Sequence, residues 1–213
     1  NLEAPEIIYN PDLKKYYLFT SYDPLMTTYN VRVSRSDAAE GPFTDYFGKA
    51  EKDTTNNFPI LTAPYRFENH PGWAGTAHCG VFTDGQGNYF MAHQGRLSPQ
   101  NQLMVLHVRQ LFFTPDGWPV VSPERYAGTP PREFTEADLV GEWEIIRVQE
   151  PKYERQLEAG QILWGEGELK DGEWNLSTRV NLAKNGTCAG EMTDDEWKNV
   201  QMNGNWSCLT EKQ

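Results

Sequence analysis

A unit of short strand-like segments joined by turn residues occurs twice within the first 126 residues. In the first unit, strands are expected at residues 6–9, 16–22 and 29–35, with a short outer strand after Gly41-Pro42-Phe43. The second unit follows residues 58–61 and a loop at 64–75, with strands expected at 79–83, 88–93, 104–110 and 118–121. The segments are rich in aromatic and β-branched residues, and turns such as Asn10-Pro11-Asp12 and Asp116-Gly117 separate them. Repetition of four strands at a period above forty residues is typical of β-propeller blades.

Two blades cannot close a propeller ring. We therefore expect at least two more N-terminal blades, either upstream in the same chain or in another chain. The predicted fold class is all-β, a partial propeller of about two blades followed by a small antiparallel β-barrel. The predicted domains are residues 1–127 for the propeller part and 137–213 for the barrel.

The C-terminal part begins after a linker, Gly128-Thr129-Pro130-Pro131, where the strand pattern changes. Strands are expected at residues 139–149, 161–169, 173–180 and 205–209. Asp171-Gly172 and Asn185-Gly186 have the composition of two-residue hairpin turns. This pattern predicts the antiparallel barrel, and whether that domain is complete stays open.

The charge of the chain limits its ligands. Its formal net charge is −11, with a pI near 4.8, whereas nucleic-acid binders carry basic patches. Nucleic acid is therefore excluded as a partner, acidic polymers are disfavoured, and a neutral glycan fits. No apolar run approaches the roughly 20 residues of a membrane helix, so we expect no membrane span.

The chain has three cysteines, Cys79, Cys188 and Cys208, so at least one thiol is unpaired. The sequence does not decide whether Cys188 and Cys208 pair. Cys79 follows His78 directly, and neighbouring residues of a strand point to opposite faces. A catalytic Cys79–His78 pair is therefore disfavoured.

Two motifs carry a family resemblance. Glu3-Ala4-Pro5 precedes one predicted strand, and Gly75-Thr76-Ala77-His78 precedes another. Together they resemble the endo-acting arabinanases of glycoside hydrolase family 43, over about residues 1–126. The resemblance implies a five-bladed propeller and a secreted, extracellular or periplasmic enzyme. It also implies hydrolysis of α-1,5-L-arabinofuranosidic linkages in arabinan or arabino-oligosaccharides, and the C-terminal part resembles the β-barrel domain of such enzymes.

The resemblance also implies roles for single residues. Inverting glycosidases use one carboxyl group as general acid and another as general base. Glu3 matches the acid of the family, and His78 matches a channel histidine that contacts a calcium ion through a largely aqueous shell. The base and a third carboxylate belong to blades outside this sequence, so the isolated chain is expected to be inactive. The loop carboxylates Asp12, Asp23, Asp37 and Asp84 are interpreted as turn residues.

Aromatic and amide side chains near Glu3 are candidate substrate contacts, because furanose C–H groups pack on aromatic faces. They are Tyr22, Tyr29, Asn30 and Trp73. Simple packing is the alternative for each, and His70 and His107 have no assigned role. Two other functions stay open: an exo-acting arabinofuranosidase or xylosidase of the same family, and a non-catalytic glycan-binding propeller.

Overall fold

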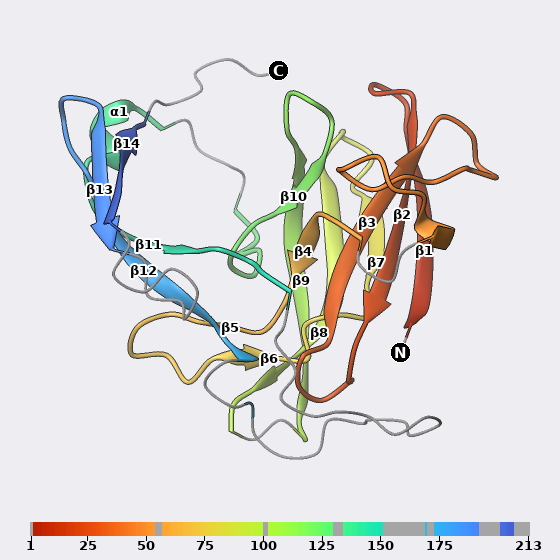
Figure 1. Ribbon diagram of the computed structural model, residues 1–213, viewed down its shortest axis with the longest axis horizontal. Helices are drawn as coiled ribbons and strands as arrows, with labels where there is room; N and C mark the ends of the chain where they lie inside the picture. Colours follow the sequence, from red (N-terminus) through yellow and green to blue (C-terminus); the bar gives the residue numbers. More distant parts are fainter. Residues whose placement is uncertain are drawn as a thin grey trace.

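The computed structural model describes residues 2–53, 57–99, 102–129, 134–150, 169, 173–191 and 201–206. In these residues the fold is dominated by β-strands (Figure 1). The helical elements described are a 3-10 turn at Glu51–Asp53 and α1 at Glu136–Leu139. The predicted all-β fold class is thereby confirmed. No helix in the described part of the chain is long and apolar enough to cross a membrane.

The first unit is a four-stranded antiparallel sheet. Its strands are β1 (Leu2–Asn10), β2 (Lys15–Tyr22), β3 (Asn30–Ser36) and β4 (Ile60–Thr62), hydrogen-bonded in sequence order. The alternation of β2 and β3 places Tyr17, Phe19, Val31 and Val33 on one fully buried face. Meander order and a buried face are the blade geometry that the sequence predicts.

The outer strand of this unit is not where the sequence predicts it. The segment after Gly41-Pro42-Phe43 makes only isolated bridges, from Thr44 to Arg35 and to Ala50. It then turns around Asp45, whose Oδ1 accepts the backbone N–H of Phe47 at 2.9 Å and of Lys49 at 2.8 Å. Because the side chain of Asp45 satisfies these donors locally, no ladder forms, and β4 supplies the fourth strand.

The second unit is built on the predicted strands. It contains β7 (Gly80–Thr83), β8 (Tyr89–Leu97), β9 (Met104–Phe113) and β10 (Pro119–Val121), all in antiparallel pairs. The expected loop between the units contains two short strands that the sequence analysis missed, β5 (Tyr65–Arg66) and β6 (Trp73–Ala74). They extend the hydrogen bonding from β8 towards the C-terminal strands.

The C-terminal part has four described strands in the antiparallel order β11-β12-β13-β14. They are β11 (Gly141–Ile146), β12 (Asn175–Leu182), β13 (Thr187–Glu191) and β14 (Gln201–Asn205). The predicted turn at Asn185-Gly186 joins β12 to β13 and is closed by the Gly186 N–H donating to Ala183 O. Residues 161–168, Asp171-Gly172 and residues 207–209 lie outside the described residues. The described order is open, so the closed barrel stays a prediction.

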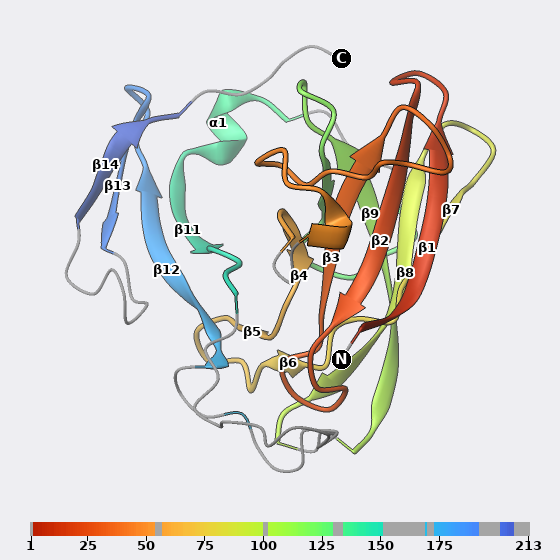
Figure 2. The same ribbon diagram turned by 45° about the vertical axis from the view of Figure 1, so that its right-hand side comes forward.

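The two parts are hydrogen-bonded to each other. Strands β5 and β12 pair in parallel over two residues each. Asn175 also donates from its backbone and its side chain to Pro64 O, at 3.1 and 2.8 Å. Figure 2 shows β12 reaching β5 and β6 at one end, while β13 and β14 lie away from the blades.

The main hydrophobic core lies between the two four-stranded units. It joins the buried face of β2 and β3 to residues on and around β7, β8 and β9, namely Ala77, Cys79, Val81, Met91 and Leu111, with Trp118 at the start of β10. Tyr29 and Ala77 of this core are next to candidate site residues, so the same packing that holds the blades together also fixes the backbone of the site.

Candidate active site

Glu3 lies at the beginning of β1, on a distorted stretch of strand. Its register partner is Ser21 of β2, and the pairing shifts between Glu3 and Glu6. Ala4 has a positive φ of 50° and Pro5 has no N–H to donate, which together explain the irregularity. Bulges of this kind redirect a side chain, and Glu3 is left about half exposed, with a side-chain exposure of 49%.

His78 is positioned by the first sheet although it precedes β7 of the second. Its backbone N–H donates to Ser21 Oγ at 2.9 Å, and its φ is 58°. A left-handed backbone is costly for a residue with a side chain, and such strain is often found at functional sites. Ser21, fully buried, is therefore a register partner of Glu3 and a direct contact of His78.

Tyr29 brings the two side chains together. Its hydroxyl donates to Glu3 Oε1 and lies 3.5 Å from His78 Nδ1, while His78 Nδ1 is 4.0 Å from Glu3 Oε1. Burial, followed by the hydrogen bond with Glu3, raises the pKa of the Tyr29 hydroxyl. The hydroxyl is thus a permanent donor at neutral pH. Its bond engages Oε1 of Glu3, whose side chain is about half exposed.

The four predicted substrate contacts are all buried, with exposed fractions of 4% for Tyr22, 1% for Tyr29, 0% for Asn30 and 7% for Trp73. Tyr29 contacts Glu3, whereas Trp73 stacks edge-on against His107 with 4.5 Å between ring centroids. Neither offers an open ring face for a sugar in this structure. Substrate contact by these residues stays a prediction, and packing accounts for their present surroundings.

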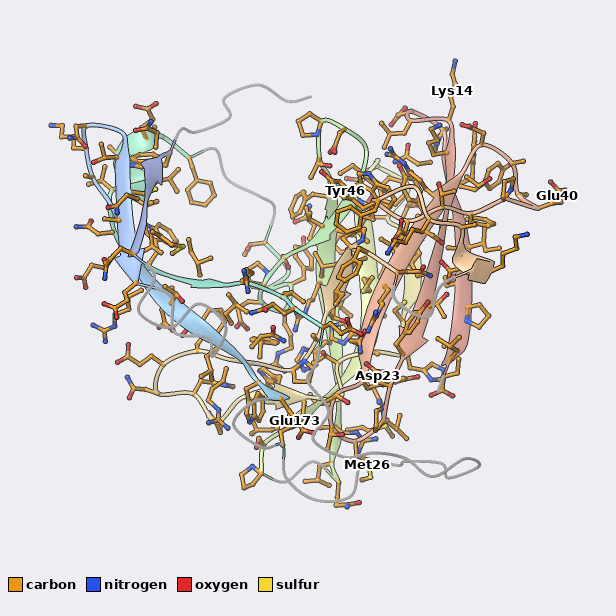
Figure 3. The ribbon with its side chains drawn as sticks, viewed as in Figure 1. Lys14, Asp23, Met26, Glu40, Tyr46 and Glu173 are labelled. Carbon is orange, nitrogen blue, oxygen red and sulfur yellow. The ribbon has the colours of Figure 1, made fainter. Side chains whose placement is uncertain are left out.

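The loop carboxylates divide into two kinds. Asp84 Oδ1 accepts the backbone N–H of Gln86 at 2.8 Å and of Asn88 at 3.2 Å, which is the turn role predicted for it. Asp23 differs, because it has a φ of 78° and its carboxylate contacts Asn30 and Arg32. Figure 3 shows Asp23 at the end of the sheet from which β1 starts, on the same edge as the candidate site.

The described residues around Glu3 and His78 offer few protein ligands for a calcium ion. Calcium prefers six to eight oxygen ligands, whereas the site offers the imidazole of His78 and the carboxylate of Glu3. Across the described residues, no group of three or more His, Cys, Asp and Glu side chains is arranged to hold a metal. The predicted calcium contact of His78, through a shell that is largely water, stays a prediction.

Cys79 belongs to the core and not to the reactive surface. It is 5% exposed, unpaired, and packed in the core between the blades. Burial, with a smaller contribution from Glu6, raises the pKa of its thiol to about 12. The thiol is therefore neutral at physiological pH and is no nucleophile. Cys188 is also unpaired, and Cys208 lies outside the described residues.

Known proteins resemble this chain in sequence and in fold. Residues 123–212 match the family of C-terminal lipocalin-like domains of glycoside hydrolase family 43. The chain is 28% identical to an extracellular endo-α-(1→5)-L-arabinanase of Bacillus subtilis, over 95% of the chain and 43% of that protein. It is 31% identical to an extracellular endo-α-(1→5)-L-arabinanase of Thermotoga petrophila, over 68% of the chain and 35% of that protein.

The same relationship is found among solved structures. An endo-1,5-α-L-arabinanase from Thermotoga petrophila superposes with a TM-score of 0.75 at 25% identity, over 98% of this chain and 43% of that one. A family 43 glycoside hydrolase of Bacillus licheniformis gives a TM-score of 0.73, also at 25% identity, over 89% of this chain and 43% of that one. The chain thus spans less than half the length of the relatives that it matches.

The fold and these matches define the class as that of the all-β glycoside hydrolases with a propeller. Within that class, the chain belongs to glycoside hydrolase family 43, among the relatives of its arabinanases.

Proposed function

We propose that the protein containing this chain hydrolyses α-1,5-L-arabinofuranosidic linkages in arabinan by an inverting mechanism, with Glu3 as the general acid. The observation that supports this role best is the environment of Glu3. The side chain lies at the beginning of the edge strand β1 and is half exposed, and one of its carboxylate oxygens accepts the hydroxyl of Tyr29. The relatives named as endo-arabinanases supply the substrate class.

In this mechanism the protonated carboxyl group of Glu3 gives its proton to the glycosidic oxygen as the bond to the anomeric carbon breaks. The carboxylate that remains keeps the hydroxyl of Tyr29 as a hydrogen-bond donor, which stabilises the new negative charge. A base must activate water on the opposite face of the sugar, about 6.5–9.5 Å from the acid. We place that base in propeller blades outside these 213 residues, which alone are expected to be inactive.

Three further parts of the proposal come from the family. The substrate is arabinan or an arabino-oligosaccharide, the protein is secreted, and a calcium ion contacts His78 while most of its other ligands come from water or from outside this chain. For this calcium contact the chain itself provides the imidazole of His78, which is 60% exposed. The backbone of His78 is fixed by its hydrogen bond to Ser21.

The experiment compares Glu3→Gln with Glu6→Gln in the enzyme that joins this chain to its preceding blades. Both variants replace one carboxylate of β1 by an amide. General acid catalysis contributes roughly 10²- to 10⁴-fold, so Glu3→Gln should lose about that factor in kcat while arabino-oligosaccharide binding is kept. Glu6→Gln should stay near the parent. Near-normal turnover of unactivated arabinan by Glu3→Gln would exclude Glu3 as the acid.

The products of the parent enzyme distinguish the two modes of action. Linear arabinan should first yield a mixture of oligosaccharides, as endo-acting cleavage requires. Release of monosaccharide alone from the first minutes would identify the exo-acting alternative. Binding of arabinan without any product from the complete protein would favour the non-catalytic glycan-binding alternative.

A further inference from the structure

Arg32, in β3, is a buried cation close to the candidate site. Its side chain is only 2% exposed, and its guanidinium lies 4.5 Å from the centre of the Tyr22 ring. Tyr22 is held in turn by hydrogen bonds of its hydroxyl to Glu51 at 3.1 Å and from Asn57 at 2.8 Å. A buried charge is costly unless polar groups offset the loss of water around it. The positions of Arg32 and of the groups around it therefore depend on one another.

On the side of the site, Arg32 contacts Asn30 and Asp23. Its Nε donates to Asn30 Oδ1 at 2.9 Å, and its Nη2 lies 3.7 Å from Asp23 Oδ2. The Asn30 amide donates to the same oxygen of Asp23 and to Thr28 O. Asn30 directly follows Tyr29, the residue that holds Glu3. The Arg32 network therefore fixes the beginning of the strand on which the donor to Glu3 stands.

On the other side, Arg32 faces a carboxylate from the C-terminal part of the chain. Glu150 Oε1 lies 3.9 Å from Arg32 Nη2. The neighbouring Gln149 donates its N–H to Asn175 Oδ1 at 2.8 Å, and Asn175 is bonded to Pro64 O. Glu150 thus lies in the segment that follows β11 (Figure 1), and this segment is hydrogen-bonded to the first residue of β12.

We propose that Glu150 is the contact by which the C-terminal lipocalin-like region holds the candidate active site in shape. Arg32 is the positioning residue, bound by Glu150 on one side and by Asn30 and Asp23 on the other. The chain of contacts runs from Glu150 through Arg32 and Asn30 to the strand position of Tyr29, and from there to Glu3. The proposal has a structural half, the link from Glu150 to Asn30, which depends on these contacts alone. Its catalytic half, the effect of that link on Glu3, rests on the proposed function.

The structural half is tested in the protein that joins this chain to its other blades, by the side-chain amide signals of Asn30 in nitrogen-15 NMR spectra. Glu150→Gln removes the charge that faces Arg32, and we expect these signals to shift or broaden. Glu142→Gln makes the same change on exposed β11 and should leave them unchanged. Asp23→Asn, which alters a direct partner of Asn30, gives the size of a full response. Asn30 signals that respond equally little to Glu150→Gln and Glu142→Gln would overturn the proposal.

The catalytic half is tested in the enzyme that includes the preceding blades. Contacts that act through a network change coupling by amounts that correspond to roughly 2- to 30-fold, so Glu150→Gln should lower kcat by a factor in that range with KM nearly unchanged. Glu150→Asp should restore part of the loss, and Glu142→Gln should show none. Parent-like kcat in Glu150→Gln, despite shifted Asn30 signals, would overturn the catalytic half. An inactive parent would instead count against the proposed function, while the NMR result would stand.

Discussion

The blades and the C-terminal strands of this chain differ in how deeply their side chains are buried. In β3 five consecutive residues are buried, whereas in β11 the described residues are exposed or intermediate, and Trp143 and Ile145 are 43% and 47% exposed. β13 alternates between exposed and intermediate positions. Among the described residues, apolar burial is therefore concentrated in the blades, while β11 and β13 contribute no buried side chains.

Polar groups show the same contrast. The blades bury Arg32, His93, His107 and Arg109, each less than 5% exposed. In the C-terminal strands, Arg179 and Glu144 stay at the surface, where Arg179 forms an ion pair with Glu68. Buried polar networks respond strongly to the loss of one member, and exposed pairs respond weakly. The candidate active site lies in the blades, the region with the buried polar groups.

The largest expected effect separates the two regions directly. Phe19→Ala removes a fully buried ring from the core between the blades and should lower the free energy of unfolding by about 3–5 kcal/mol. Ile145→Ala, on the exposed face of β11, should cost less than about 1 kcal/mol. Urea denaturation followed by tryptophan fluorescence measures both. Equal losses would mean that β11 is packed as tightly as the blades.

A smaller effect is expected from pH, through the buried His93–His107 pair, whose ring centroids are 5.0 Å apart. Burial, helped by Arg109 and Arg125, lowers the pKa of His107 to about 4 from its usual 6.5, and burial also lowers the pKa of His93. The unfolded chain therefore binds protons that the folded chain does not. The contribution of the neutral histidines to the free energy of unfolding is fully present above pH 6.5. It falls as the pH decreases towards 4, by roughly 3 kcal/mol for His107.

The measurement is urea denaturation at several pH values between 4 and 7, with His107→Gln as the comparison. The variant removes one titrating group, so its stability should fall less steeply over this range than that of the parent. Carboxylates titrate in both proteins and cancel in the difference. Parallel curves would show that His107 is accessible to protons in the folded protein.

The sequence predicts the blade strands well because their alternation is enforced by the core. β2, β3, β7, β8 and β9 lie close to the expected segments. The outer strand of the first blade was misplaced, since the turn around Asp45 is made by a side chain and leaves no hydrophobic pattern. Two-residue strands such as β5 and β6 are too short for any periodicity to indicate them.

The site was predictable in its two motif residues and not in what surrounds them. Glu3 and His78 follow from the motifs, and the structure brings them within 4.0 Å. Ser21 and Arg32 carry no local signal, because their importance arises from cross-strand register and from a partner more than a hundred positions away in sequence. The sequence predicts a turn residue at Asp23 because Asp is common in loops, whereas its carboxylate contacts Asn30 and Arg32.

The smallest of these effects concerns the contact between the regions at Gly72. Gly72 has a φ of 98°, and a Cβ there would lie 2.6 Å from the ring of Trp174, at the start of β12. Gly85 has a similar φ of 76° with nothing within 4 Å. Gly85→Ala should therefore cost about 1 kcal/mol from backbone strain alone, and Gly72→Ala about 2 kcal/mol.

Adding Trp174→Phe should bring the cost of Gly72→Ala, measured by urea denaturation, close to that of Gly85→Ala, because the clashing ring atoms are removed. Equal costs for the two glycine variants in the parent background would show that β12 moves away easily, and that the C-terminal strands are docked on the blades more loosely than the hydrogen bonds of Asn175 indicate.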